Sequence, residues 1–454
     1  MPLPSPLIAR PLDGWLDAES LFLHLFADSD AAFWLDAGPQ AVDGWSILGA
    51  GVVEHDPDAV RELPLAADDG EDAAVPFRGG WVGWLDYETG ARAAGAPVAT
   101  TEGEPRGTWV AAERAVALDH ARRRLWTLAD TASAETWHAQ VQAVMSDAVP
   151  AAPPAVPAAS TAVARHGVRE YTALIADCRE AIRRGDAYQL CLTTRFCAPR
   201  PADPLSVYRR LRAATPAHHG GYLRAGDRCL LSASPEQFLA VSRGVVSTSP
   251  IKGTRPRSDD PAEDARLAEE LRTDVKERAE NVMIVDLMRN DLSHVGVPGS
   301  LRVERLWQVE SYPAVHQLVS TVSVRLRDGI RFGDLCDAAF PAGSMTGAPK
   351  LSAMTILHRL EDAPRGVYAG CFGHVGLDGR VDLAMVIRSI VVERDGAYVG
   401  TGGGITWLSR PDAEAAEVAT KARAPLAALA AELPAEWAAL AAERPEGRGA
   451  GNTR

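Results

Sequence analysis

The sequence predicts an α+β fold. Segments with the periodicity of strands and segments with the periodicity of helices occur in clusters along the chain, whereas a doubly wound parallel sheet would need them to alternate. Apolar residues make up 46% of the 454 residues, which is enough for a large buried core. The sequence has no internal repeat of fixed period, so a repeat architecture is not expected.

Residues 1–148 form the first predicted region. Short apolar runs bounded by turn residues predict strands at 31–35 and 45–53, and a weak helical pattern covers 134–148. Proline and alanine then dominate residues 149–163, a composition typical of a semi-rigid or disordered linker.

The region after the linker, residues 164–430, has more regular patterns. Apolar residues spaced three and four apart predict an amphipathic helix from Tyr171 to Ile182 that stops at Gly185. Residues 187–196 have the pattern of a strand. The remaining expected elements are a helical segment at 261–291, strands at 383–392 and 397–399 around a hairpin turn at Asp395 and Gly396, a helical segment at 412–431, and a helix end with a flexible polar tail at 431–454.

Charge and cysteine usage restrict the class of protein. Lys and Arg number 47 against 60 Asp and Glu, and the net charge of −13 disfavours nucleic acid or an anionic membrane as the main partner. None of the six cysteines has the spacing of a zinc site, which favours buried thiols in a reducing compartment. Because the N-terminus lacks a signal-peptide pattern and no apolar run reaches about 18 residues, we expect a cytoplasmic protein.

Two acidic pairs are candidates for a metal site. Glu277 and Glu280 lie in one predicted helix, Glu414 and Glu417 lie in another, and a spacing of three residues puts each pair on one helix face. If the two helices meet, four carboxylates converge and repel one another. Mg²⁺ would relieve that repulsion, because it binds one or two protein carboxylates and keeps several waters. Two solvated helix faces would give the same pattern.

A glycine run and a lone arginine are candidates for anion binding. Gly402, Gly403 and Gly404 follow a predicted strand, where backbone N–H groups could surround an anion as a nest does. A plain turn is the alternative. Arg388 is a single cation within an apolar strand and would suit a bidentate carboxylate, unless it simply faces solvent.

One lysine has the context of a nucleophile. Lys252 lies in the run PIKG, where its backbone is restricted, and the nearby Arg255 and Arg257 would lower its pKa and leave part of it as a free amine. Glu236 could act as its acid–base companion, and His316 is a further candidate. A surface lysine in a basic loop and a structural histidine are the alternatives.

Taken together, these segments resemble the chorismate-utilising enzymes, in particular the component I group of aminodeoxychorismate synthases. GGWVGWLDYETG (79–90) is similar to the N-terminal region of that family, and the rest of residues 1–148 is similar only loosely. The motifs that match in order between residues 165 and 424 are GDAYQLCLTTRF (185–196), SPEQFL (234–239), PIKGTRPR (250–257), KERAENVMIVDLMRND (276–291), FPAGSMTGAPK (340–350), RGVYAGCFG (365–373), VIRS (386–389), GGGI (402–405) and EAAEVATKA (414–422).

The resemblance implies paired antiparallel sheets flanked by helices, with the N- and C-terminal parts interleaved. It also implies chorismate as the substrate and Mg²⁺ as the cofactor. Glu280 and Glu417 would hold Mg²⁺, with Glu277 and Glu414 beside them. The implied substrate contacts are Tyr368, Arg388, Gly402, Gly403 and Gly404 for the enolpyruvyl carboxylate, Ser344 near the C4 hydroxyl, and Lys421 at the carboxylate end.

Two positions distinguish reactions within the family. Gln189 stands where water-activating members carry a lysine, and a glutamine cannot abstract a proton, so hydroxylation is disfavoured. Lys252 stands in PIKGT, where anthranilate synthases read PIAGT. The resemblance therefore implies that Lys252 attacks ring position C2 while Glu236 protonates the departing C4 hydroxyl, and that ammonia then adds at C4. His316 would be a hydrogen-bond partner or secondary acid.

The implied product is 4-amino-4-deoxychorismate, which supplies 4-aminobenzoate and folate synthesis. The chain has no cysteine in a GxCxG context, so ammonia is expected from a separate glutamine amidotransferase subunit. An anthranilate synthase large subunit and a chorismate-binding subunit without turnover are the alternatives. Two departures from the family, Gln237 in place of arginine and Cys191 in place of a small or polar residue, are expected to alter loop packing.

Overall fold

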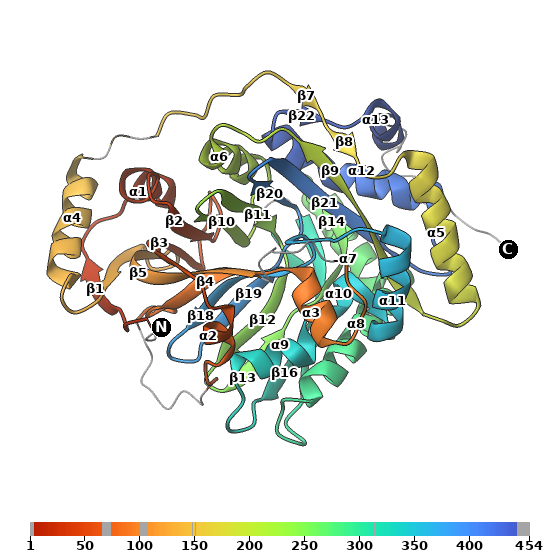
Figure 1. Ribbon diagram of the computed structural model, residues 1–454, viewed down its shortest axis with the longest axis horizontal. Helices are drawn as coiled ribbons and strands as arrows, with labels where there is room; N and C mark the ends of the chain where they lie inside the picture. The colour runs from red at the N-terminus through yellow and green to blue at the C-terminus, as the bar shows by residue number, and fades with distance from the viewer. Residues whose placement is uncertain are drawn as a thin grey trace.

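A computed structural model describes residues 4–65, 74–99, 107–147, 149, 151–312 and 315–442 of the chain. Helices and antiparallel strands are both abundant, and they are arranged in clusters (Figure 1), so the α+β prediction is confirmed. Within these ranges 20 strands join in one continuous sheet, and the short strands β7 (Ser160–Thr161) and β22 (Ala431–Glu432) pair separately.

The N-terminal region has strands where the apolar runs predicted them. The runs at 31–35 and 45–53 are strands β2 and β3, and the segment at 134–148 is helix α4. The elements of this region are β1 (Ile8–Leu12), α1 (Ala18–Leu25), β2 (Ala31–Asp36), β3 (Trp45–Glu54), α2 (Pro57–Arg61), β4 (Gly80–Leu85), α3 (Tyr87–Ala93), β5 (Gly107–Asp119), β6 (Arg124–Ala129) and α4 (Ala134–Asp147).

The proline- and alanine-rich segment is held against a helix along part of its length. Arg209 Nη2 donates to the Ala152 carbonyl at 2.5 Å, and Arg210 Nη1 donates to the Ala155 carbonyl at 2.6 Å. Both arginines belong to α6 (Pro204–Ala214), and the segment then enters β7, which pairs in parallel with β22. Hydrogen bonds therefore tie this segment to the C-terminal region.

The predicted helix at 171–182 and strand at 187–196 are α5 and β9. The elements from α5 onward are α5 (Val168–Arg183), preceded by β8 (Val163–Ala164), β9 (Gln189–Ala198), α6, β10 (His219–Ala225), β11 (Arg228–Ser234), β12 (Gln237–Ser242), β13 (Val245–Thr248), β14 (Ile251–Pro256), α7 (Pro261–Thr273), α8 (Val275–Ser293), β15 (Arg302–Ser311), β16 (Val315–Arg325), α9 (Phe332–Ala339), α10 (Gly343–Thr346), β17 (Gly347–Ala348), α11 (Lys350–Glu361), β18 (Cys371–Gly376), β19 (Val381–Met385), β20 (Ser389–Glu393), β21 (Gly396–Ile405), α12 (Pro411–Ala428), β22 and α13 (Ala435–Ala442).

The two halves of the chain interleave in the sheet, as the family resemblance implied. β2 pairs with β10, with Asp36 opposite Gly220, and β4 pairs with β18, with Trp84 opposite Phe372. Strands from the two ends of the chain, β4 and β18, accordingly lie side by side (Figure 1). Their side chains share one buried apolar cluster, in which Trp84 and Phe372 are both almost completely inaccessible to solvent.

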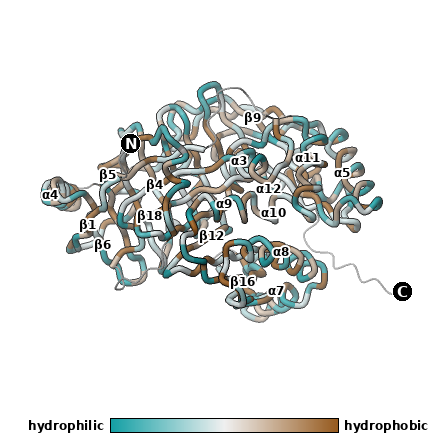
Figure 2. Tube along the Cα trace, turned by 60° about the horizontal axis from the view of Figure 1, so that its bottom comes forward, coloured by the Kyte–Doolittle hydropathy of each residue, from teal (hydrophilic) through white to brown (hydrophobic). Residues whose placement is uncertain are grey.

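The helical segment predicted at 261–291 is divided into two helices. Asp274 ends α7 and begins α8, where its side chain accepts a hydrogen bond from the Glu277 backbone N–H at 3.0 Å. An aspartate in this position satisfies one of the free N–H groups at a helix start, and it therefore favours a new helix over continuation of the old one. Figure 2 shows α7, α8 and β16 grouped on one side of the molecule.

The prediction of one continuous strand at 383–392 is wrong, because the structure has two strands there. β19 ends at Met385, β20 begins at Ser389, and Arg388 between them has a φ of 52°. The expected hairpin at Asp395 and Gly396 is confirmed, since β20 and β21 pair antiparallel with Glu393 opposite Gly396.

The helix predicted at 412–431 is α12, which ends at Ala428. The helix end and flexible tail predicted at 431–454 are wrong for the first part of that range, which forms β22 and helix α13, and the residues from 443 onward lie outside the described residues. In the part of the chain that the structure describes, no helix combines the length and apolar character needed to cross a lipid bilayer.

Candidate active site

A cavity of about 480 Å³ brings the predicted site residues together. It lies between β14, α8 and β16 on one side and α10, β21 and α12 on the other. Of the residues singled out from the sequence, those that line it are Glu236, Lys252, Glu277, Glu280, Ser344, Tyr368, Arg388, Gly402, Gly403, Gly404, Glu414, Glu417 and Lys421. Gln189 and His316 do not.

The two acidic pairs enter the cavity from two different helices. Glu277 and Glu280 lie one turn apart near the start of α8, and Glu414 and Glu417 lie one turn apart near the start of α12. Lys276 lies among them: burial lowers the pKa of its ammonium, but the four carboxylates outweigh burial and raise that pKa overall. The four glutamates therefore line one cavity.

The surroundings raise the pKa of two of these glutamates. Burial raises the pKa of Glu277, and the neighbouring Glu280 raises it further. Burial likewise raises the pKa of Glu414, with Glu417 adding to the effect and a hydrogen bond from Ser409 opposing it. Both shifts show carboxylates whose charge is only partly compensated by the protein.

Two lysines supply part of the missing positive charge. Lys421 Nζ lies 2.9 Å from Glu417 Oε1 and donates to the Gly402 carbonyl at 2.9 Å. Lys276 Nζ lies 3.7 Å from Glu280 Oε1. Within the described residues, no set of three or more His, Cys, Asp or Glu side chains is close enough to form a ready-made metal site. The donors nevertheless fit Mg²⁺ in kind, since that ion needs only one or two protein carboxylates besides water and ligand oxygens.

Glu236 is the buried acid of the cavity. It follows β11 and is only 8% exposed. Burial raises its pKa above the usual range, and this effect exceeds the lowering by Lys252, the Ile251 backbone N–H and the Ser344 hydroxyl. A carboxyl with a raised pKa can stay protonated near neutral pH, as a general acid must.

The two arginines near Lys252 are engaged by carboxylates. Arg255 forms ion pairs with Glu270 and Asp274, both at 3.0 Å, and Arg257 pairs with Asp264 at 2.8 Å. The positive charges of Arg255 and Arg257 are thus compensated by carboxylates. The prediction that they act on Lys252 assumed that these charges were uncompensated.

Arg388 faces the cavity from a strained backbone position. Its φ of 52° lies in the left-handed region, which a residue with a side chain adopts only when its surroundings compensate the strain. Burial lowers its pKa, which Glu417 and Tyr368 partly oppose. Tyr368 lies against β21, where Gly400 has no side chain: a Cβ at Gly400 would approach the Tyr368 Cγ to 2.1 Å.

The three glycines form part of a strand and do not form the predicted nest. Gly402, Gly403 and Gly404 pair with β9 within β21, and none of them has a positive φ. Their lack of side chains still matters, because a Cβ at Gly404 would come within 2.6 Å of the Gln189 amide nitrogen. The Gln189 side chain therefore lies beside Gly404, completely buried and without a hydrogen-bond partner in the described structure.

His316 lies outside the cavity, and its neighbour Gln317 lines it. The His316 imidazole is held by Asp264 at 2.9 Å and by Ser311 at 2.8 Å. Since successive side chains of a strand point to opposite faces, Gln317 of β16 takes the position facing the site. Sequence analysis singled out the histidine on chemical grounds. The alternation of β16 means that only one of these two neighbours faces the cavity, and the pairing of the strand decides which one. Lys276, inside the motif KERAEN, was missed as well.

The two departures from the family motifs have packing roles. Gln237 Nε2 donates to Asp382 Oδ1 at 3.0 Å between β12 and β19. Cys191 is buried at the cavity wall, and its backbone carbonyl accepts a hydrogen bond from Arg365 at 2.8 Å.

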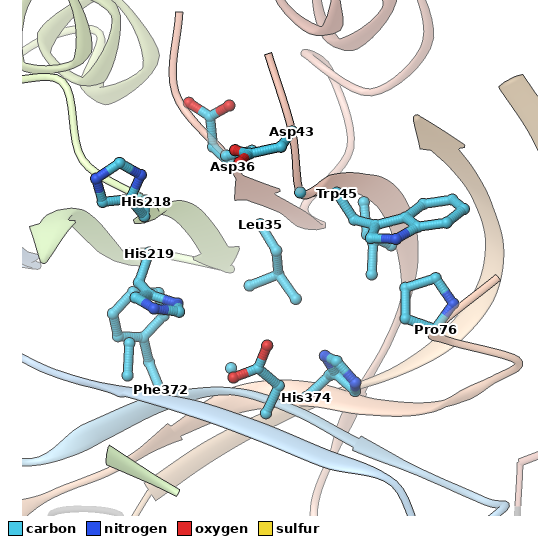
Figure 3. Close-up of a pocket in the computed structure, with 16 residues that line it drawn as sticks. Leu35, Asp36, Asp43, Trp45, Pro76, His218, His219, Phe372 and His374 are labelled. Carbon is cyan, nitrogen blue, oxygen red and sulfur yellow. The ribbon is translucent and has the colours of Figure 1, made fainter. Parts of the chain in front are cut away.

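A second cavity, of about 300 Å³, lies between the N-terminal strands and β18 (Figure 3). Its described lining contains three aspartates and three histidines and no lysine or arginine. Burial lowers the pKa of His219 and of His374, which keeps these imidazoles neutral. Such a lining is poorly suited to a dianionic ligand, whereas the first cavity offers Lys252, Arg388 and Lys421.

Comparison with known proteins agrees with this geometry. The chain is 39% identical to aminodeoxychorismate synthase from Streptomyces pristinaespiralis, over 91% of this chain and 64% of that relative. It is 38% identical to anthranilate synthase component 1 from Streptomyces coelicolor, over 93% of this chain and 88% of that relative. Anthranilate synthase component I from Streptococcus pneumoniae, known from a crystal structure, has a TM-score of 0.71 to this chain at 27% identity, covering 94% of this chain and 93% of the other.

The chain spans less than two thirds of the length of the Streptomyces pristinaespiralis relative. The likeness to the Streptococcus pneumoniae structure confirms the fold implied by the sequence motifs, because it extends over nearly the whole of both chains. Residues 23–427 match the family described as chorismate binding enzyme, and the chain belongs to that family.

Proposed function

We propose that this chain aminates chorismate as component I of an aminodeoxychorismate synthase. The reaction converts chorismate and ammonia to 4-amino-4-deoxychorismate and water. The observation that carries the proposal is the shared cavity of Lys252 and Glu236: one offers an amine nucleophile, and the other is a buried acid whose pKa burial raises. The 39% identity to an aminodeoxychorismate synthase supports the same conclusion.

Chorismate carries two carboxylates, which need cationic or polar partners at two ends of the cavity. Arg388 and the Tyr368 hydroxyl would bind the enolpyruvyl carboxylate beside Gly402, Gly403 and Gly404, where the missing side chains leave room. Lys421 would support the opposite, ring-carboxylate end. Gln189, behind Gly404, offers no general base for activating water.

Mg²⁺ is the proposed cofactor. Glu280 and Glu417 would hold it, with Glu277 and Glu414 beside them, because all four carboxylates line the same cavity. When bound, the ion would supply charge stabilisation at the ring carboxylate.

The chain's own residues would carry out two displacements. The Lys252 amine attacks C2, both ring double bonds shift, and the C4–O bond breaks as Glu236 gives its proton to the leaving hydroxyl, which departs as water. Ammonia then forms a bond to C4 while the C2–nitrogen bond breaks. The departing Lys252 amine takes up the proton that the new amino group loses, and transfer of that proton to Glu236 restores the starting state of both groups. The enolpyruvyl group stays on the ring, so a separate lyase would be needed to form 4-aminobenzoate for folate synthesis.

Ammonia would come from a partner glutamine amidotransferase. The relatives named component 1 are by that name parts of larger assemblies, which supports a second component for this chain. In vitro, ammonium salts would replace the partner.

Anthranilate synthase component I is the second candidate. The observation that favours it is the 38% identity to the Streptomyces coelicolor relative, of which this chain covers 88%. The two reactions differ in product, because anthranilate formation releases pyruvate. They also differ in mechanism, because anthranilate formation needs no covalent bond to a lysine.

Product analysis with chorismate, Mg²⁺ and ammonium chloride distinguishes the candidates. We expect 4-amino-4-deoxychorismate by mass spectrometry, with no pyruvate released. Fluorescent anthranilate and stoichiometric pyruvate from this chain alone would refute the proposal. A second measurement omits ammonia: intact mass should then show a chorismate-derived adduct that peptide mapping assigns to Lys252.

A further inference from the structure

Gln317 holds a buried hydrogen-bond acceptor that the protein leaves unused. The residue is 5% exposed, and its side-chain Oε1 has no hydrogen-bond partner in the described structure. Other buried side-chain atoms in the described ranges also lack a partner, but Gln317 is the residue among them that lines the cavity of the candidate site.

The position of Gln317 places it beside the proposed nucleophile. In the pairing of β14 with β16, Gln317 is opposite Thr254, and Lys252 is opposite Leu318. Gly253 between them is bulged out of register with a φ of 75°, a conformation that suits glycine. Lys252, Thr254 and Gln317 all line the same cavity.

An unpartnered buried acceptor destabilises the fold, because it has given up its hydrogen bonds to water without replacement. The fold does not use this oxygen for packing or for a network within the described residues. A ligand that brings an N–H or O–H group into the cavity would use it.

Among the reactants of the proposed function, one remains as the hydrogen-bond donor to Gln317 Oε1. The inference therefore rests on the proposed function. In that function, the two carboxylates of chorismate and its C4 hydroxyl would face Arg388, Lys421, Glu236 and Ser344. Carboxylates cannot donate to an amide oxygen, and the hydroxyl is directed to the acid that protonates it. Ammonia is the remaining reactant and carries only N–H donors and one lone pair.

We propose that Gln317 Oε1 accepts a hydrogen bond from ammonia and holds it in the cavity with its lone pair free to attack C4. An amide oxygen does not take up a proton at neutral pH, so Gln317 orients the nucleophile and does not titrate. The C4–nitrogen bond forms and the C2–nitrogen bond to Lys252 breaks, as in the proposed reaction. The proton lost by the new amino group goes to the departing Lys252 amine.

The test compares ammonium and chorismate kinetics in Gln317→Met, which keeps the length of the side chain and removes the acceptor. We expect the KM for ammonium to rise about 3- to 10-fold, the range that the loss of one hydrogen bond predicts. The KM for chorismate and the amount of Lys252 adduct formed without ammonia should not change. The melting temperature should stay equal or rise, since an unsatisfied buried group is removed.

Two further variants control the interpretation. Gln317→Glu keeps an acceptor oxygen and should hold the KM for ammonium closer to the wild-type value than Gln317→Met does. Gln142→Met makes the same replacement at an exposed glutamine of α4 and should change neither KM.

The outcomes separate this inference from the function on which it rests. A normal adduct with an unchanged KM for ammonium in Gln317→Met overturns the inference alone. A rise confined to the KM for chorismate also overturns it, because it makes Gln317 a chorismate contact. A lower melting temperature with unchanged kinetics makes it a structural residue. Absence of the adduct in the wild-type protein overturns the proposed function, and the inference with it.

Discussion

Arg365 and Glu361 form an ion pair directly behind the cavity wall, with Arg365 Nη2 2.7 Å from Glu361 Oε1. The two side chains are 2% and 3% exposed. Arg365 also donates to the backbone carbonyls of Cys191 at 2.8 Å and Met345 at 2.6 Å, and both of these residues line the cavity. This pair therefore ties α11 to two segments that shape the site.

Breaking this pair should destabilise the whole protein. Glu361→Gln leaves the buried Arg365 guanidinium without its negative partner, and Arg365→Met leaves the buried Glu361 carboxylate without its positive partner. Each substitution should lower the free energy of unfolding by about 3–5 kcal/mol. The double variant should lose less than the sum of the two, because no unpaired charge remains. Urea unfolding followed by circular dichroism measures this.

The matched control is Glu269→Gln, which breaks the exposed pair with Arg272. It should leave the unfolding curve unchanged, because solvent screens exposed charges. Equal effects at the buried and exposed pairs would contradict the assignment of Arg365 as the residue that holds the cavity wall.

Lys252→Ala should abolish formation of 4-amino-4-deoxychorismate while chorismate binding is retained. The side chain is proposed as the nucleophile, whereas binding is assigned to Arg388 and Lys421. Lys252→Arg separates charge from nucleophilicity, since a guanidinium stays protonated and does not attack carbon. Both variants should lose the adduct in intact mass spectra. A wild-type rate in Lys252→Arg would leave the residue as a cation only.

The raised pKa of Glu236 predicts how the rate of adduct formation depends on pH. Burial raises its pKa, so the protonated form that the mechanism needs is present at lower pH and disappears as pH rises through that pKa. The rate of adduct formation should fall on the alkaline side. Glu236→Gln should lower the rate by roughly 10²–10⁴-fold and remove that limb of the profile. An unchanged alkaline limb in Glu236→Gln would assign the titration to another group.

The same shift also affects stability. A carboxyl whose pKa is raised by folding favours the folded state while it is protonated, and that contribution is lost as pH rises through the folded-state pKa. Glu236→Gln removes the ionisation, so its melting temperature should exceed the wild-type value at pH 8 and approach it at pH 4.

The sequence was sufficient to predict the helices that carry the carboxylates. Glu277 and Glu280, and Glu414 and Glu417, are spaced for one helix face, which is a local property. The break at Asp274 also had a local signal, because aspartate is a preferred helix N-cap, yet the long charged run concealed it. Local patterns thus identified the elements and most of the residues that the cavity brings together.

Other features of the site depend on tertiary contacts that no local pattern encodes. The strained φ of Arg388 follows from the junction of β19 and β20, and the charge compensation of Arg255 and Arg257 comes from α7 and Asp274. The choice between His316 and Gln317 depended on which face of β16 meets the cavity. That choice cannot be made without knowing how the strand pairs.

Removal of Mg²⁺ should abolish turnover. Treatment with EDTA should stop product formation and addition of Mg²⁺ should restore it. Glu280→Gln and Glu417→Gln should each weaken Mg²⁺ binding roughly 10-fold or more, measured by titration calorimetry with chorismate present. Glu263→Gln alters an exposed carboxylate of α7 that pairs with Arg266, and it should bind Mg²⁺ as the wild type does. Full activity after exhaustive chelation would contradict the metal assignment.

Gly400→Ala should damage the site by displacing Tyr368, to which the nearest atoms belong. The added Cβ would lie 2.1 Å from Tyr368 Cγ, so the ring must move out of its place at the cavity wall. Because small misplacements of a substrate-positioning group have large kinetic effects, kcat/KM for chorismate should fall about 10- to 100-fold. Gly396→Ala, at the start of the same strand, meets only the Ala198 carbonyl at 3.2 Å and should have a far smaller effect. Tyr368→Phe keeps the ring and loses the hydroxyl, so a larger loss in Gly400→Ala than in Tyr368→Phe would assign the effect to ring position. Wild-type kinetics in Gly400→Ala would show that Tyr368 does not position the substrate.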